Sequence, residues 1–276
     1  TISYAEDSGR QMLSSDAFGF SDSVDADTPN QLSQVIVDAI SGNGVFMLGN
    51  TVVTAGQVID ASDLSTLSFQ ADANVHGDSY ASLTFRLRDD GGTAYDGNDT
   101  EATAHTLTFN ITPVNDAPSG ADKTITYLED GGKHVLSADL FGFADANDSA
   151  APNTLSKVII DGISGEGTFL LGNTQVSNGD VIDVSDLERL TFEAAANDFG
   201  SGYASMTFRL VDDGGTGNGG VDTEATAHTL RFDITSVNDA PSGTNKTITY
   251  QEDSGNHLLG ASIFGFSDTA DAASPD

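Results

Sequence analysis

The sequence has no cysteine, no tryptophan, only ten lysine and arginine residues, and no apolar run long enough to span a bilayer. Without cysteine, no disulfide staples the fold and no thiolate binds a metal or attacks a substrate. Ten basic residues stand against 42 aspartates and glutamates, which gives a formal net charge of -32. Binding to nucleic acid or to an anionic membrane surface needs basic residues. We therefore expect no nucleic-acid partner and no direct membrane insertion.

The acidity has two interpretations. The carboxylates form a solvated, self-repelling surface that keeps the protein soluble, or some of them are ligands of Ca²⁺, which takes about six to eight oxygen atoms. The apolar fraction of 38% argues against disorder. The chain starts without a signal peptide and stops within a repeat, so we expect it to be a segment of a longer polypeptide.

The strongest signal is internal repetition. Residues Thr1–Asp7 recur as Thr124–Asp130 and again as Thr247–Asp253, with an offset of 123 residues each time. Asn115–Pro118 recurs at the same offset as Asn238–Pro241. Proline cannot donate a ladder hydrogen bond and holds the preceding residue extended, so the Asn-Asp-Ala-Pro segments mark the boundaries. We predict two full repeats, residues 1–118 and 119–241, and the truncated start of a third, residues 242–276.

Within each repeat the apolar residues alternate with polar ones. Leu83, Phe85 and Leu87 are separated by Thr84 and Arg86, which is the pattern of a half-buried strand. The same reasoning predicts strands at residues 1–5, 11–15, 32–40, 44–48, 57–59, 67–71 and 104–112. About seven to nine short strands in one unit indicate an all-β fold, an antiparallel β-sandwich. The one short helical candidate is residues 61–64, where Ser62 or Asp63 is expected to cap a single turn.

The junction motif has a family resemblance. Pro113-Val114-Asn115-Asp116 runs into Ala-Pro, and each repeat then has Glu-Asp, Phe-Gly-Phe and, before its last strand, Asp-Asp-Gly-Gly. This order resembles the bacterial cadherin-like tandem repeats, the extender domains of giant surface adhesins of the repeats-in-toxin and biofilm type. The resemblance implies tandem immunoglobulin/cadherin-like β-sandwiches with Ca²⁺ at the domain junctions, located outside the cell or at its surface. It also implies a rod whose partners are the neighbouring repeats, while the ligand of the distal module is unknown. Unlike animal cadherins, the linker lacks a second asparagine.

In a sandwich of the implied topology, the chain alternates between two ends of each repeat. The turn after the first strand then lies near the exit linker, and the loops at residues 22–30 and 89–99 face the preceding repeat. The resemblance therefore implies a first set of metal ligands, namely Glu6, Asn115, Asp116, Asp145, Asp148 and Asp212. It implies a second set made of Glu129, Asn238, Asp239, Asp268 and Asp271.

Each of these residues also has a purely structural interpretation. Aspartate and asparagine in turns commonly accept hydrogen bonds from nearby backbone amides. For the set as a whole the ion is favoured, because carboxylates that converge without a cation repel one another. Asp63 and Asp186 fit helix caps better than metal ligands.

Catalysis finds little support in the sequence. His105 and His228 occupy equivalent positions, but each lies at the start of a predicted strand, and the sequence contains no nucleophile elbow, phosphate loop or His-Glu-x-x-His motif. Two functions remain. The first is a calcium-rigidified extender of a surface adhesin, and the second is a tandem ligand- or glycan-binding module. Most aromatic residues fall at core positions rather than on an exposed face, which favours the extender. We predict that the protein is not an enzyme.

Overall fold

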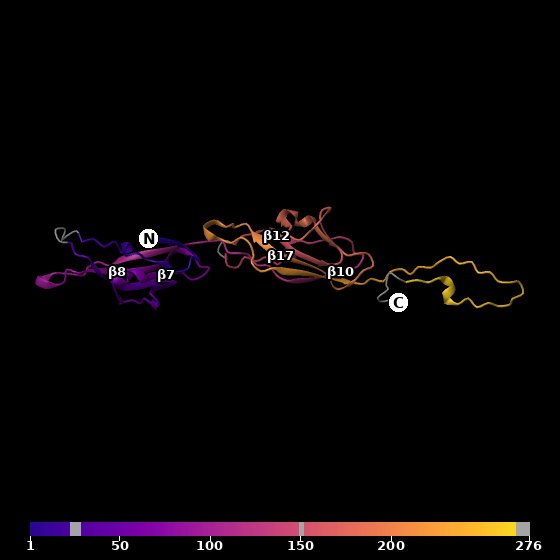
Figure 1. The fold of residues 1–276 in the computed structure, drawn as a ribbon, viewed down its shortest axis with the longest axis horizontal. Coiled ribbons are helices and arrows are strands. Elements are labelled where there is room, and N and C mark those ends of the chain that lie inside the picture. The colour runs from indigo at the N-terminus through magenta and orange to yellow at the C-terminus, as the bar shows by residue number, and fades with distance from the viewer. Residues whose placement is uncertain (23–28, 149–151, 269–276) are drawn as a thin grey trace. The chain divides into compact units, whose positions relative to one another are not determined.

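The computed structural model describes residues 1–22, 29–148 and 152–268 (Figure 1). The chain divides into two compact units. The first contains residues 1–116 together with 215–220, and the second contains residues 117–214 and the chain from 221 onward. In the described part of the chain, no helix is long and apolar enough to cross a membrane. The repeat boundaries expected from sequence, at residues 118 and 241, remain predictions.

The first unit is built from two sheets. One has five strands in the order β1 (Ile2–Ala5), β9 (His105–Thr112), β8 (Gly77–Asp89), β3 (Leu32–Gly42) and β6 (Val58–Asp60). The other has four strands in the order β2 (Gln11–Met12), β7 (Leu67–Gln70), β4 (Val45–Leu48) and β5 (Thr51–Val52). The rings of Phe69, from the four-stranded sheet, and Phe109, from the five-stranded sheet, stack with their centroids 4.7 Å apart. The two sheets therefore face each other as a β-sandwich.

The second unit repeats this topology strand for strand. Its five-stranded sheet has the order β10 (Lys123–Leu128), β18 (His228–Thr235), β17 (Gly200–Asp212), β12 (Leu155–Gly165) and β15 (Val181–Asp183). Its four-stranded sheet has the order β11 (His134–Val135), β16 (Leu190–Glu193), β13 (Thr168–Leu171) and β14 (Thr174–Gln175). The predicted class of tandem β-sandwiches is thereby confirmed.

One strand pair in each unit is parallel. β1 pairs with β9, and β10 with β18, in parallel registers, whereas the other strand pairs described are antiparallel. The first and last strands of a unit thus run in the same direction. The chain consequently enters each sandwich at one end and leaves it at the other.

Short 3₁₀ helices fill the connections, and here two expectations were wrong. The segment predicted as a strand at residues 11–15 ends at Met12, and Ser15 already begins a 3₁₀ helix. The predicted turn at 61–64 is a 3₁₀ helix, but it begins after Asp60 and no side chain caps it, so neither Ser62 nor Asp63 has the expected role. Asp186 likewise lies within its helix, where it pairs with Arg189. The helices are η1 (Ser15–Phe18), η2 (Ala61–Thr66), η3 (Ala94–Asp96), η4 (Ala138–Leu140), η5 (Val184–Arg189), η6 (Gly217–Gly219) and η7 (Ala261–Phe264).

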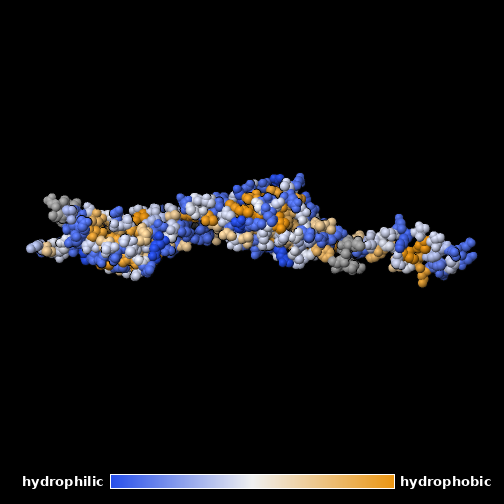
Figure 2. Space-filling model, in the orientation of Figure 1, coloured by the Kyte–Doolittle hydropathy of each residue, from blue (hydrophilic) through white to orange (hydrophobic). Residues whose placement is uncertain are grey.

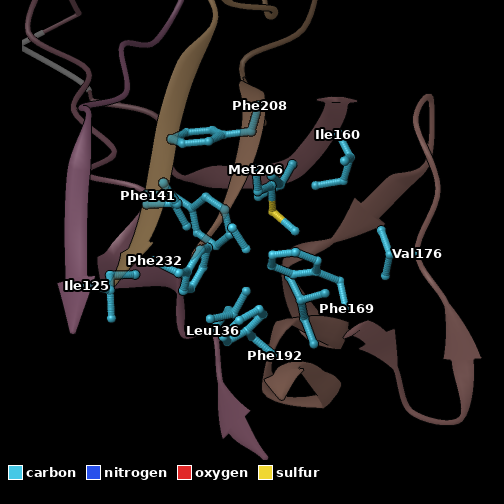
Figure 3. Close-up of a cluster of buried hydrophobic side chains, with 14 of the residues drawn as sticks. Ile125, Leu136, Phe141, Ile160, Phe169, Val176, Phe192, Met206, Phe208 and Phe232 are labelled. Atoms are coloured by element: carbon cyan, nitrogen blue, oxygen red, sulfur yellow. The ribbon is translucent and has the colours of Figure 1, made fainter. Parts of the chain in front are cut away.

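The hydrophobic cores follow the predicted alternation. Phe85 and its counterpart Phe208 are 2% and 0% exposed, and the polar residues between the core positions face outward. Figure 3 shows Phe208 above the cluster that contains Phe141, Phe169 and Phe232. Hydrophilic residues cover much of the visible face of both units (Figure 2). The interpretation that most acidic side chains form a solvated surface is consistent with this distribution.

Replacement of Phe208 by alanine tests the core. The substitution removes a fully buried ring and leaves a cavity, so Phe208→Ala is expected to lower the free energy of unfolding by about 3–5 kcal/mol. The matched control is Phe264→Ala, because this ring is 63% exposed. Chemical denaturation monitored by circular dichroism measures both variants. Equal stability of the two variants would contradict the assigned strand orientation.

Candidate metal-binding ends of the repeats

Glu6 lies at the end of the first unit where the chain leaves it. Its backbone N–H continues the parallel pairing of β1 by donating to the Thr112 carbonyl oxygen at 2.9 Å. Its side chain is buried, and Oε1 accepts a hydrogen bond of 2.8 Å from the N–H of Val114, just before Asn115 and Asp116. The predicted proximity of this glutamate to the exit linker is therefore present within the unit.

The second unit repeats the arrangement with one change. Glu129 is 2% exposed, and its Oε1 accepts a 2.6 Å hydrogen bond from the N–H of Val237. In the first unit the other oxygen of Glu6 lies 3.3 Å from Nδ1 of His76. The position equivalent to His76 is Phe199, which offers no donor. The second copy thus has the same buried carboxylate without the imidazole beside it.

At the opposite end of the second unit, two loops are tied together by aspartates. Oδ2 of Asp145 accepts a hydrogen bond from the N–H of Asn153, and Oδ1 of Asp213 accepts one from the next residue, Thr154. Asp213 also returns a backbone N–H bond to the Thr154 carbonyl oxygen. Asp212 is 3% exposed. The loop that holds Asp145 and the loop that holds Asp212 are therefore neighbours, as predicted.

Consecutive aspartates have different roles in this loop. The pKa of Asp213 is lowered, chiefly by the backbone N–H of Thr154 and then by its hydroxyl group, both of which donate to the carboxylate. Asp212 is turned inward instead, and its Oδ1 accepts from the N–H of Gly214. Asp213 is therefore a structural aspartate whose carboxylate accepts hydrogen bonds within the loop. Asp212 combines a turn contact with burial.

Buried carboxylate oxygens without a hydrogen bond occur at three of the predicted ligand positions. A buried polar atom without a partner costs about 1–3 kcal/mol, so such atoms are rare in folded proteins. Carboxylate oxygens can meet this cost by coordinating a cation. The three atoms are Oε2 of Glu129, Oδ1 of Asp145 and Oδ1 of Asp268.

The described residues do not by themselves form a complete metal site. Within residues 1–22, 29–148 and 152–268, no three histidine, aspartate or glutamate side chains converge closely enough to hold an ion. Asn115 and Asp116 are half-buried, Asn238 is exposed, Asp239 is half-buried, and Asp148 is buried. Asp271 lies outside the described residues. The two ligand sets remain predictions.

The sequence analysis missed one feature that both repeats share. His105 contacts Glu101, and His228 contacts Glu224 at 2.7 Å, in each case four residues apart. Glu224 is 5% exposed and accepts a hydrogen bond of 2.8 Å from the N–H of Gly120. The repetition of a Glu-x-x-x-His spacing in both copies was the available signal. The equivalence of His105 and His228 alone, at the start of two predicted strands, did not reveal the glutamate partners.

The sequence matches no family model and no curated protein. Solved structures with a similar arrangement include mouse protocadherin-24 EC1-3, with 13% sequence identity, a TM-score of 0.41 and coverage of 73% of this chain and 58% of that one. The protocadherin gamma-B4 extracellular domain has 16% identity, a TM-score of 0.38 and coverage of 78% and 30%. The human desmocollin-1 ectodomain has 16% identity, a TM-score of 0.33 and coverage of 88% and 40%. This chain spans less than two thirds of each of these structures.

The pKa of Asp213 gives a test of the loop contacts. Because that pKa is lowered in the folded state, the contact stabilises the fold at pH values above the ordinary aspartate range and is lost as the pH falls through the lowered pKa. Thr154→Val removes the hydroxyl donor but keeps the N–H, so the pKa of Asp213 is expected to rise toward its ordinary value. A carboxyl-carbon NMR titration measures it. The control is Thr223→Val, whose hydroxyl donates to Asp222. An unchanged titration of Asp213 in Thr154→Val would show that the hydroxyl contact is absent in solution.

Proposed function

We propose that this chain is a calcium-stabilised structural extender from a large extracellular adhesin of the bacterial surface type. The observation that carries the proposal is the coincidence of three buried, unbonded carboxylate oxygens with positions predicted as calcium ligands. The choice of Ca²⁺ follows from the donors, which are all hard oxygens in a chain without cysteine. The adhesin context rests on the resemblance of the repeated junction sequence.

The proposed ions act through the short covalent connection between repeats. β9 ends at Thr112 and β10 begins at Lys123, so few residues separate two acidic ligand groups. Glu6 belongs to the first group with Asn115 and Asp116, and the second group is contributed by the following repeat. An ion shared by both groups would replace mutual repulsion with a common attraction. A string of such repeats then functions as a stiff spacer, with its neighbouring repeats as its partners.

Replacement of Glu129 by glutamine tests the calcium ligand directly. An ion bound only by the folded state stabilises it by mass action, by about 2.7 kcal/mol when its free concentration is a hundred times Kd. Calcium is therefore expected to raise the melting temperature of the wild-type chain relative to chelator. Glu129→Gln keeps the acceptor for Val237 but removes the negative charge. It should lower stability in calcium and leave stability unchanged or raised in chelator, where the buried charge is only a cost.

The matched control is Glu188→Gln, which removes an exposed carboxylate of the same type. It is expected to change stability little in either condition. Differential scanning calorimetry in millimolar calcium, in millimolar magnesium and in chelator measures all three proteins. Identical melting of the wild-type chain in the three solutions would refute the calcium assignment.

Asp116→Ala tests the stiffening role separately from folding. The residue belongs to the linker and to neither hydrophobic core, so each unit should stay folded. We expect a broader distribution of angles between the two units than in the calcium-loaded wild-type chain, measured by double electron–electron resonance between spin labels on exposed strands. The chelated wild-type chain should resemble the variant. A wild-type distribution that is equally broad with and without calcium would rule out the extender mechanism while leaving the sandwich fold intact.

A further inference from the structure

The first unit has a groove of about 580 Å³ at one side of its core. Its floor is apolar and includes Phe18, Phe85 and Leu107, while Glu101 and His105 form part of its wall. The rings of Phe18 and Phe85 meet edge to face at 5.0 Å. The groove therefore lies between η1 and the strands β8 and β9, directly over buried aromatic residues.

In the second unit the same place is covered by the chain itself. Residues 117–122 run over it before β10 begins, and Ser119 forms two backbone hydrogen bonds of 2.8 Å with Ala144. The N–H of Ala121 donates to the Phe141 carbonyl oxygen at 3.1 Å. Asp122 accepts a hydrogen bond of 2.7 Å from the N–H of Thr229. This covering segment, with the sequence Ala-Pro-Ser-Gly-Ala-Asp, is thus fixed by main-chain and side-chain contacts along its length.

The buried pair Glu224–His228 receives the middle of the covering segment. Oε1 of Glu224 accepts the N–H of Gly120 at 2.8 Å. A Cβ atom at Gly120 would lie 3.0 Å from Cδ2 of His228 and 3.2 Å from the ring of Phe208. Glycine therefore fits at this position with the least crowding, and a branched side chain would collide with the rings of His228 and Phe208.

The floor of the groove has the same geometry in both units. Phe141 and Phe208 meet edge to face at 4.9 Å, as Phe18 and Phe85 do at 5.0 Å. What differs is exposure. The side chain of Glu101 is 31% exposed and that of Glu224 is 6% exposed, and the corresponding values for His105 and His228 are 52% and 21%. The first groove is therefore preformed, and its polar pair is in place without a covering segment.

The third copy of the motif indicates that the contact is a general property of these repeats. Ser242 forms the same pair of backbone hydrogen bonds, here with Ser267, and the N–H of Thr244 donates to the Phe264 carbonyl oxygen at 3.4 Å. Both covering segments of this chain are thus engaged within their own repeats. A second copy of the chain would have to break these contacts in order to donate one.

We propose that the groove of the first unit is a binding site for an extended segment of the Pro-Ser-Gly-x-Asp type, joined to the amino side of Thr1. The equivalents of the contacts in the second unit are the backbone of Ser21, the carbonyl oxygen of Phe18, the carboxylate of Glu101 and the N–H of Thr106. By equivalence with the second unit, Ser21 offers one donor and one acceptor to the backbone of the segment, and Phe18 and Glu101 offer acceptors to its next N–H groups. The N–H of Thr106 is the donor for the side chain of the aspartate in the segment. Each repeat is then completed by the linker that leads into it, so the linker is part of the following fold as well as a connection.

Hydrogen exchange on an extended chain tests this proposal. The nine residues 115–123 are copied in front of Thr1 of the full chain, and amide exchange of Ser21 and Thr106 is followed by NMR. Exchange at both amides should slow by about tenfold or more, because the segment would protect both amides. The amides of Ala144 and Thr229 are internal references, since both already donate to the covering segment of the second unit. The measurement is made in chelator, so its outcome does not depend on the calcium proposal.

The matched control is the same extension in which only the added copy of Gly120 is replaced by valine, while the native Gly120 is kept. This variant should lose the protection, because the valine side chain would collide with His105 and Phe85. Protection that survives this change would show that the segment only shields the surface, and the proposal would be wrong. Unchanged exchange in the extended chain would also overturn it. If protection instead appears in the unextended chain and grows with protein concentration, the occupant is a second copy, contrary to the proposal.

Discussion

The parallel pairing of the first and last strands determines where the other features lie. β1 hydrogen-bonds to β9 along four residue pairs, and β10 to β18 along six. Because the paired strands run in the same direction, the residue that follows the first strand comes to lie beside the segment that follows the last. Glu6 and Glu129 are thereby placed next to the start of an exit linker. The same pairing places the segment that precedes the first strand at the opposite end of the sandwich. In the second unit this segment, residues 117–122, contacts the start of β18 through Asp122 and Thr229.

Much of the fold could be predicted from residue pattern alone. The period-two alternation around Phe85 identified the buried face of β8, since a half-buried strand admits few other solutions. The pattern was less informative where the chain bends. Leu13 is buried and its N–H still donates to the Leu67 carbonyl oxygen, yet the chain turns into η1 two residues later. The caps were mispredicted because the 3₁₀ helix starts right after Asp60, so that Ser62 and Asp63 lie inside it.

The candidate site could be predicted only in part. Topology placed Glu6 beside the linker, because this follows from the direction of the strands. The separate roles of Asp212 and Asp213 could not be predicted from two consecutive aspartates in the sequence, because these roles depend on which carboxylate accepts the hydrogen bond from Thr154. The Glu224–His228 pair was missed because its role is to hold Gly120, which lies more than a hundred residues away in sequence. Local spacing identifies candidate ligands, but partners that are distant in sequence decide their function.

The parallel strand pair has a mechanical consequence. Tension applied at the two ends of one sandwich pulls β1 and β9 past each other along their length, because the chain enters at the beginning of one and leaves at the end of the other. The hydrogen bonds between them are then loaded in shear and must yield together, whereas a hairpin pulled from its open end yields one bond at a time. A sandwich with this strand order would transmit a pull without lengthening until the whole ladder fails.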